Sequence, residues 1–307
     1  MIILQDSQIK KIFHNGDEVK KILDWNGNVV FEKESAPVMT NDIKFHTTSD
    51  VTNKAKFLVV YTDATTSSIN YLVKDTWYTS KIPTDKTVYS INTYSSIYVD
   101  EIIVSGKIQL FNNFFHYKPK TIRLLSCDAT SSTSLTSLFS SVTNIETIEI
   151  RDLNVSNITD MYRMFYNCSA TIIDIANWDT SSATNFKNVF DSCKNVASLD
   201  LSSWDSSNVT SMSEMFQYCT SLGTLDLSAF NTSNVTDFSY MFWGCTNLTS
   251  LNLSGWDMSR IHVNPTMFYN CGNLTTIKMI GCNKTTIDRM KGALSNANML
   301  SQVTIIT

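Results

Sequence analysis

The sequence predicts an α/β solenoid over residues 121–307, preceded by β-rich domains over residues 1–120. Two observations predict the solenoid. The first is a step of 25 or 26 residues between successive phenylalanines, which are Phe165, Phe190, Phe216, Phe242 and Phe268. The second is an apolar-polar-apolar triplet that opens each copy, as in Leu199, Asp200 and Leu201. Self-similarity at a fixed period of this length is the signature of a repeat architecture.

Residues 1–35 are expected to form a small separate module. The run that begins at Ile9 recurs ten residues later at Val19, and an Asn-Gly pair follows each run. Asn-Gly between apolar runs favours a hairpin, because both residues tolerate positive φ. We therefore expect a three-stranded meander over about 9–14, 18–23 and 28–32. Three short strands are only marginally stable alone, so the module should either anchor the chain on a partner or cap the next domain.

Residues 36–120 are expected to form a second, β-rich domain, to which we assign no fold. The runs Phe57 to Tyr61 and Ile102 to Val104 are rich in the β-branched and aromatic residues that favour strands. We expect the last part of this domain to form an irregular first rung of the solenoid.

The repeats themselves contain eight expected strands. These begin at or near Ile122, Ile148, Ile173, Leu199, Leu225, Leu251, Ile277 and Val303. In each clear copy a Trp or Phe then closes one edge of the core, and in most copies a Thr precedes Met, Phe and Cys at helical spacing. We expect the Thr to cap a short helix. One repeat cannot cover its apolar face, but stacked repeats bury it continuously, as in a solenoid of the leucine-rich-repeat type.

The repeat Leu-x-Leu-Ser-x-Trp-Asp-x-Ser-x-Val-Thr-x-Met-x-x-Met-Phe-x-x-Cys resembles the BspA-like leucine-rich repeats of microbial surface proteins. The resemblance is close from Ile148 to Cys271 and looser over 122–307. It implies adhesion or another extracellular binding activity. The Ile-Lys-Lys-Ile module at the N-terminus resembles, over about 25 residues, segments at the start of gut-phage virion proteins.

Composition limits the partners and the place of action. A net charge of −4 with 17% charged residues does not favour a nucleic-acid partner, which needs a concentrated basic face. No apolar run approaches 18 residues, so we expect no membrane insertion. Asp6 and Gln8 interrupt the first apolar run, which is not typical of a signal peptide. We therefore expect a virion protein made in the host cytoplasm. The alternative is an extracellular or cell-surface bacterial adhesin whose leader is missing from the sequence.

The candidate binding site is a polar strip on the concave face of the solenoid sheet. It comprises the polar residue at the centre of each triplet and the serine that follows some triplets: Glu149, Asp174, Asp200, Ser202, Asp226, Ser228, Asn252 and Ser254. Neighbouring strands lie about 4.8 Å apart, so these side chains form a row. Such a row suits a cation or a polyhydroxylated ligand such as a glycan. The alternative is a solvated repeat surface with screened charge.

The five repeat cysteines are expected to be core residues. They are Cys168, Cys193, Cys219, Cys245 and Cys271. Metal sites use clustered pairs such as C-x₂-C, and free cysteine behaves as a small buried apolar group. The histidines and serines match no metal or catalytic motif. We therefore expect no metal, no cofactor, no catalytic residue and no enzymatic activity.

The C-terminus and the N-terminal module suggest the partners. The chain stops on an apolar strand at Val303 to Ile305, and an open strand edge invites pairing. Either the segment from Thr286 to Asn296, expected to be helical, shields this end or a second subunit does. We expect a homo-oligomer that binds other virion proteins through residues 1–35 and a host-surface protein or glycan through the solenoid.

Overall fold

The first module is an antiparallel meander. In the computed structural model the described residues are 119–128, 130, 132–150, 153–261 and 265–307, together with nine earlier strands. The first three, β1 (Ile9–Asn15), β2 (Glu18–Asp24) and β3 (Val29–Glu32), form one sheet in the order β1-β2-β3. The expected three strands are therefore confirmed. Contacts divide the chain into two compact units, Met1–Thr40 and Asn41–Thr307.

Six strands follow in the second unit. They are β4 (Asp42–Thr47), β5 (Lys56–Tyr61), β6 (Thr66–Asn70), β7 (Thr76–Lys81), β8 (Val88–Thr93) and β9 (Glu101–Lys107). β6, β5 and β8 form a three-stranded antiparallel sheet. β4 pairs antiparallel with β7 and β9, whereas β9 pairs parallel with β10 (Thr121–Asp128). The first parallel pairing of the solenoid thus already involves β9. This agrees with the expectation that the end of the second domain forms an irregular first rung.

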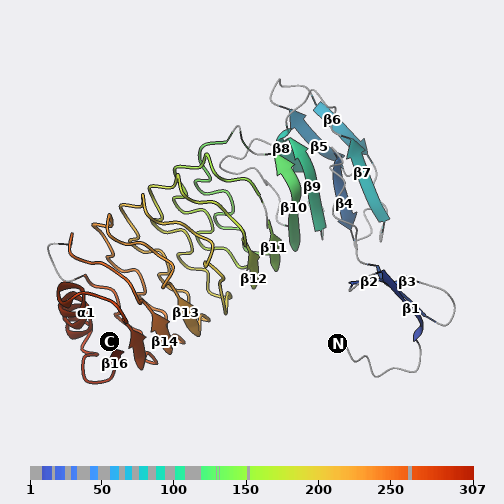
Figure 1. The fold of residues 1–307 in the computed structure, drawn as a ribbon. Helices are drawn as coiled ribbons and strands as arrows, with labels where there is room; N and C mark the ends of the chain where they lie inside the picture. Colours follow the sequence, from blue (N-terminus) through green and yellow to red (C-terminus); the bar gives the residue numbers. More distant parts are fainter. Residues whose placement is uncertain are drawn as a thin grey trace. The chain divides into compact units, whose positions relative to one another are not determined.

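The repeats form a parallel solenoid with a period of about 26 residues, which confirms the predicted fold class. Its further strands are β11 (Thr147–Glu149), β12 (Ile172–Asp174), β13 (Thr224–Asp226), β14 (Ser250–Asn252), β15 (Thr276–Lys278) and β16 (Thr304–Ile306). β13 to β16 lie side by side along one side of the rungs (Figure 1). Leu225 faces Leu251, which faces Ile277, so the apolar strand positions stack in register.

The short helices expected in each repeat do not form, and consecutive turns take their place in the described rungs. The backbone N–H groups of one rung instead donate to carbonyls of the next, at 2.7–2.9 Å. These bonds run from Met212 to Asp237, Glu214 to Ser239, Phe216 to Met241 and Tyr218 to Trp243. A helix would direct its N–H groups to carbonyls four residues earlier. The neighbouring rung already supplies acceptors, and positive φ at Glu214 and Tyr218 (59° and 54°) turns the chain toward them.

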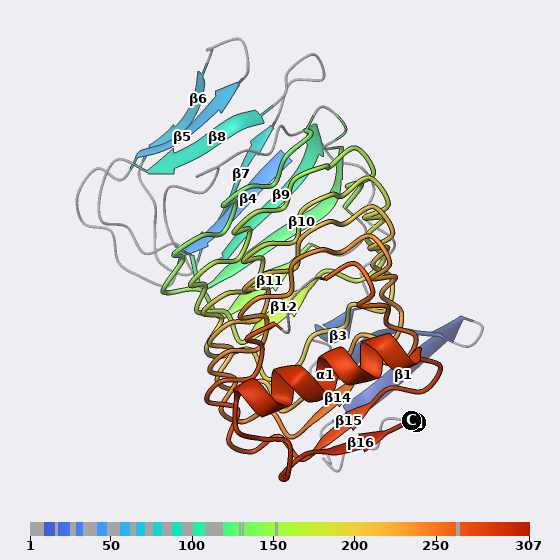
Figure 2. The same ribbon diagram turned by 90° about the vertical axis from the view of Figure 1, so that its left-hand side faces the viewer.

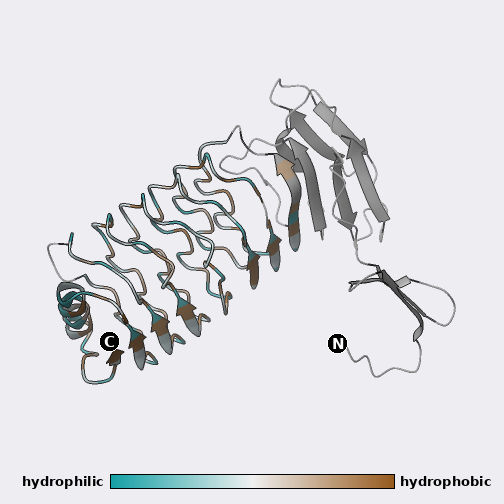
Figure 3. Ribbon diagram, in the orientation of Figure 1, coloured by the Kyte–Doolittle hydropathy of each residue, from teal (hydrophilic) through white to brown (hydrophobic). Residues whose placement is uncertain are grey.

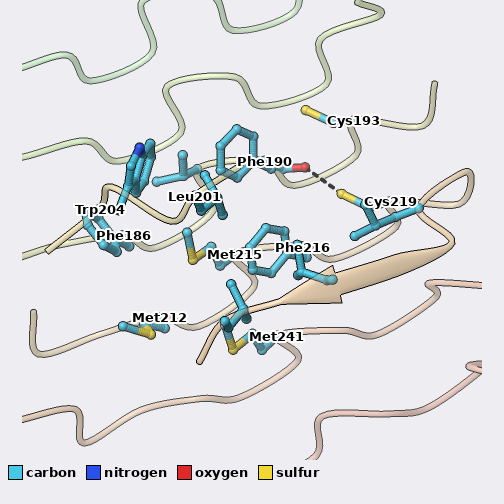
Figure 4. Close-up of a cluster of buried hydrophobic side chains, with 14 of the residues drawn as sticks. Phe186, Phe190, Cys193, Leu201, Trp204, Met212, Met215, Phe216, Cys219 and Met241 are labelled. Carbon is cyan, nitrogen blue, oxygen red and sulfur yellow. Dashed lines mark hydrogen bonds between the residues drawn. The ribbon is translucent and has the colours of Figure 1, made fainter. Parts of the chain in front are cut away.

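The core consists of stacked columns of identical side chains. Phe139, Phe165, Phe190, Phe216, Phe242 and Phe268 stack with ring centroids 5.3–5.8 Å apart. The cysteines are buried, as predicted, and each of the last four donates its thiol to the carbonyl of a phenylalanine in the previous rung. Figure 4 shows this bond between Cys219 and Phe190, which is 3.1 Å long. Hydrophobic and hydrophilic stretches alternate along the rungs (Figure 3).

The helix α1 (Lys284–Asn296) covers the C-terminal end of the core (Figure 2). Shielding of this end by a helix was one of the two alternatives that the sequence left open. Its side chains Met290, Ala293 and Leu294 are buried, and Asn283 caps it by accepting a 2.8 Å bond from the Thr286 amide. Because α1 lies between β15 and β16, the last strand is displaced from the regular step. Ile305, not Val303, lies opposite Ile277, two residues beyond the regular step. In the described residues no helix is long and apolar enough to cross a membrane.

Candidate functional site

The structure places the predicted polar strip on the outer side of two separate stretches of sheet. Glu149 lies opposite Asp174 on β11 and β12, and Asp226 lies opposite Asn252 on β13 and β14. The intervening rung, which contains Asp200, carries no assigned strand. The apolar neighbours of the four strand residues are buried, and beside Asp200 Leu201 is buried while Leu199 is partly buried. The polar side chains therefore face outward, as expected.

The acidic and amide groups of the strip are bonded to the chain that follows them. Asp226 Oδ1 accepts from the Ser228 amide at 2.9 Å and from its hydroxyl at 2.6 Å. Asp200 and Ser202 repeat this pattern at 3.1 and 2.7 Å. A side-chain oxygen that binds the amide two residues on forms an Asx turn. The serines predicted to flank a ligand therefore close the turns at the ends of the strands; the same arrangement joins Asn252 and Ser254.

Charges in the strip are partly compensated within it. Glu149 accepts a 2.6 Å bond from the Arg123 guanidinium. The second carboxylate oxygen of Asp226 accepts from the Asn252 side chain at 2.9 Å. The hydrogen bond from the Ser228 hydroxyl holds the pKa of Asp226 below its usual value, helped by the charge of Lys278. Among the described residues no three His, Cys, Asp or Glu side chains gather as metal ligands would. Ligand binding by the strip stays a prediction.

The same Asx turn recurs in a second column, away from the strip. Asp179, Asp205 and Asp257 each accept from the amide of the serine two residues later, at 2.8–3.0 Å. Asn231 does the same at 3.1 Å. Recurrence in these four consecutive rungs indicates that the pattern Asp/Asn-x-Ser serves the turns of the fold. Much of the polar composition of the repeats is thus part of the scaffold.

A buried polar network joins two rungs at one end of the turn segments. The Asn188 side-chain amide donates to Asp191 at 2.8 Å and to Glu214 at 2.9 Å. Lys187 lies 3.5 Å from Glu214. Burial raises the pKa of Asp191, and the nearby charge of Glu214 raises it further. Arg163 lies over two tyrosine rings on the preceding rung. The charge of Arg163 partly opposes the rise in the pKa of Asp191.

The repeat thiols are held in their protonated form. Burial raises the pKa of Cys168 to about 11 and that of Cys271 to about 12. It raises the pKa of Cys193, Cys219 and Cys245 well above the ordinary value. Since the thiolate is the nucleophile and the metal ligand, these side chains are unsuited to either role.

Sequence reasoning missed a group of aromatic side chains at the surface, which we name the aromatic patch: Tyr218, Tyr240, Trp243 and Tyr269. Trp243 is half-buried. The three tyrosines are 41%, 41% and 54% exposed. The Trp243 ring lies 5.2 Å from that of Tyr240 and 4.5 Å from that of Tyr269. The signal was present in the sequence, because the equivalent positions of the earlier rung, Asn188, Asp191 and Ser192, are polar.

Comparison with known proteins identifies the repeats. A family model described as "Mycoplasma protein of unknown function, DUF285" matches residues 133–225 and 199–305. Together the two matches span more than half of the 307 residues. This is compatible with the resemblance to BspA-like repeats, whereas the resemblance of the first 35 residues to phage virion proteins stays a prediction. No curated protein matches the chain. The matched span and the repeat solenoid show that the chain belongs to the DUF285 family.

Proposed function

We propose that this protein is a non-catalytic binding protein that attaches to a host surface through its solenoid, as a tail fibre, head fibre or other receptor-binding component of a phage virion. One observation carries the proposal. Inward-facing side chains are fixed by stacking in register, while some positions outside the core, such as the column of Glu214 and Tyr240, differ from rung to rung. Solenoids of this kind present extended surfaces that suit binding.

Two features support a non-catalytic role. The repeat cysteines have pKa values raised by burial, so they supply no thiolate nucleophile. The carboxylates of Asp200 and Asp226 accept hydrogen bonds that close turns. Chemically versatile side chains of the repeats are therefore used to build the scaffold.

The place of display has two candidates. The resemblance of residues 1–35 to segments at the start of gut-phage virion proteins supports a virion. In this setting the compact unit Met1–Thr40 would bind other virion proteins. The second candidate is a bacterial cell-surface or secreted adhesin. The description of the matching family, which names Mycoplasma proteins, supports it, as does the resemblance to BspA-like repeats.

We also propose a homo-oligomer. Although α1 covers the end of the core, β16 is the last strand in the sheet order β13-β14-β15-β16, so among the described strands one of its edges has no neighbour. Its residue Ile306 is 46% exposed. An apolar edge strand favours pairing with another chain. Light scattering of the whole chain at micromolar concentration tests this, and a monomer would contradict it.

Binding and display are tested separately. Fluorescently labelled whole chain, added to bacterial cells, should bind saturably and be displaced by unlabelled chain in flow cytometry. An absence of saturable binding would contradict the binding function. Immunogold labelling with an antibody against the solenoid should mark phage particles after lysis. Label confined to the cell envelope would instead support the adhesin.

A further inference from the structure

We propose that the aromatic patch is a binding site for a neutral glycan. The inference rests on the proposed binding function and names the ligand class and the residues that contact it. It differs from the predicted polar strip, which belongs to the strand part of each rung. The patch belongs to the turn segments on either side of the second methionine position of the repeat, which is Met241 in the rung of Tyr240 and Trp243.

The four rings lie on three adjacent rungs. Trp243 contacts Tyr240 within its own rung and Tyr269 in the next, at centroid distances of 5.2 and 4.5 Å. Tyr218, from the rung before, packs on the backbone of Gly244, where an added Cβ would lie 2.4 Å from the ring. Gly244 has a φ of 76°, so glycine allows both this turn and the close approach of the ring.

The fold does not require aromatic side chains at these positions. Tyr240 occupies the column of Asn188 and Glu214, and Trp243 occupies the column of Asp191 and Gln217. Those rungs have the same turns and the same inter-rung hydrogen bonds. The exposed rings are thus additions to a scaffold that forms without them. Large apolar groups at the surface, gathered on adjacent rungs, indicate an interaction site.

The chemistry of the patch favours a neutral, polyhydroxylated ligand. Tyr and Trp combine a flat apolar face with a polar group. The C–H face of a sugar ring can lie on such a surface while its hydroxyl groups bond to polar neighbours. Gln217 and Asn270 flank the rings in the sequence and supply neutral donors and acceptors. No aliphatic side chain belongs to the patch.

Charge argues against a polyanionic ligand. Residues 195–271, which carry the whole patch, contain no lysine and a single arginine, Arg260. Proteins that stack nucleic-acid bases on aromatic rings also line the site with positive charge. Acidic polysaccharides would need the same compensation. A neutral glycan needs none.

The arrangement of the rings also suits a polymer. The patch advances along the solenoid axis with the rungs, and adjacent strands of a sheet lie about 4.8 Å apart. This is close to the length that one pyranose unit adds to an extended glycan. A glycan lying along the axis would therefore place successive sugars over successive rungs, near Tyr218, Trp243 and Tyr269.

The test uses affinity electrophoresis of the whole chain in native gels that contain mannan, dextran or xyloglucan, with acidic alginate for comparison. The variant carries Tyr240→Asn and Trp243→Gln. Both new residues occur in the same columns of other rungs, and asparagine tolerates the φ of 59° at position 240. The matched control is Ile280→Ala, at an exposed apolar residue outside the patch. Circular dichroism checks that each variant is folded.

We expect at least one neutral polysaccharide to retard the wild type and alginate not to retard it. The aromatic variant should bind the retarding polysaccharide at least about tenfold more weakly, because a few aromatic residues carry most binding energy. Equal retardation of wild type and aromatic variant would overturn the site but leave the binding function intact. Retardation by alginate alone would overturn the ligand class.

Saturable binding to cells without retardation by any of these neutral polysaccharides would overturn the glycan proposal alone. If the chain neither binds cells nor is retarded, the binding function is overturned as well. If the aromatic variant does not fold, hydroxyl-radical footprinting of the wild type replaces it. Protection of Tyr240 and Trp243 by the retarding polysaccharide supports the site, and unchanged oxidation of both overturns it.

Discussion

Replacing Phe216 by alanine tests whether the phenylalanine column holds the solenoid together. The side chain is fully buried, and its ring stacks between Phe190 and Phe242 at centroid distances of 5.7 and 5.8 Å. Truncating a buried phenylalanine to alanine costs about 3–5 kcal/mol. We expect the upper part of this range, because two stacked pairs are lost and each contributes about 0.5–1.5 kcal/mol beyond burial. A loss of this size is a large share of the 5–15 kcal/mol, roughly, that stabilises a typical domain.

The assay is urea unfolding followed by circular dichroism, combined with hydrogen exchange read by mass spectrometry. Each repeat contacts only its neighbours, so exchange should accelerate most in the rungs of Phe190, Phe216 and Phe242. The control is Leu300→Ala, at a side chain that is 47% exposed, which should change stability by no more than about 0.5 kcal/mol. A loss below about 1 kcal/mol for Phe216→Ala, or acceleration no greater there than elsewhere, would refute the reasoning.

Three further outcomes are expected. In urea unfolding, Gly244→Ala should destabilise the protein more than Gly255→Ala. Both glycines have positive φ, 76° and 79°, but only at Gly244 would the added Cβ meet a neighbouring ring. Equal losses of unfolding free energy would contradict that contact. In maleimide labelling at pH 8, mass spectrometry should find half-buried Cys282 modified before Cys219, whose pKa burial raises strongly; similar rates would disprove the assigned burial. The depressed pKa of Asp226 stabilises the fold above its ordinary value of 3.8, and this contribution is lost as pH falls through the lowered pKa. Asp226→Asn should therefore flatten the acid limb of unfolding free energy against pH, and an unchanged limb would count against the assigned bonds.

The solenoid could be predicted because its cause is visible in a single sequence. A core column requires the same kind of residue at every period, and the buried positions of Phe216, Cys219 and Leu225 recur accordingly. Strand positions followed from the apolar-polar-apolar triplet, since its side chains alternate between core and solvent. The displaced register of Ile305 could not be predicted, because α1 lengthens the final repeat.

The missing helices have a different cause. Met, Phe and Cys recur at spacings that suit one face of a helix, and consecutive turns can bury the same residues. The choice depends on acceptors that belong to the next rung, such as the Met241 carbonyl, which binds the Phe216 amide at 2.9 Å. Propensity within one repeat contains no information about these partners. Tertiary hydrogen bonds thus decided the local structure.

The same reasoning separates scaffold from function among the polar residues. The strip was predicted as a binding site because its acidic residues recur, yet recurrence is what a structural role produces. Asp200 and Asp226 each accept a hydrogen bond from the amide two residues later. Asp205, which lies outside the strip, accepts the same bond. A position that changes character between rungs, without changing the turn it occupies, is not explained by the scaffold. Trp243 is such a position, and for this reason the search for a ligand should begin at the aromatic patch.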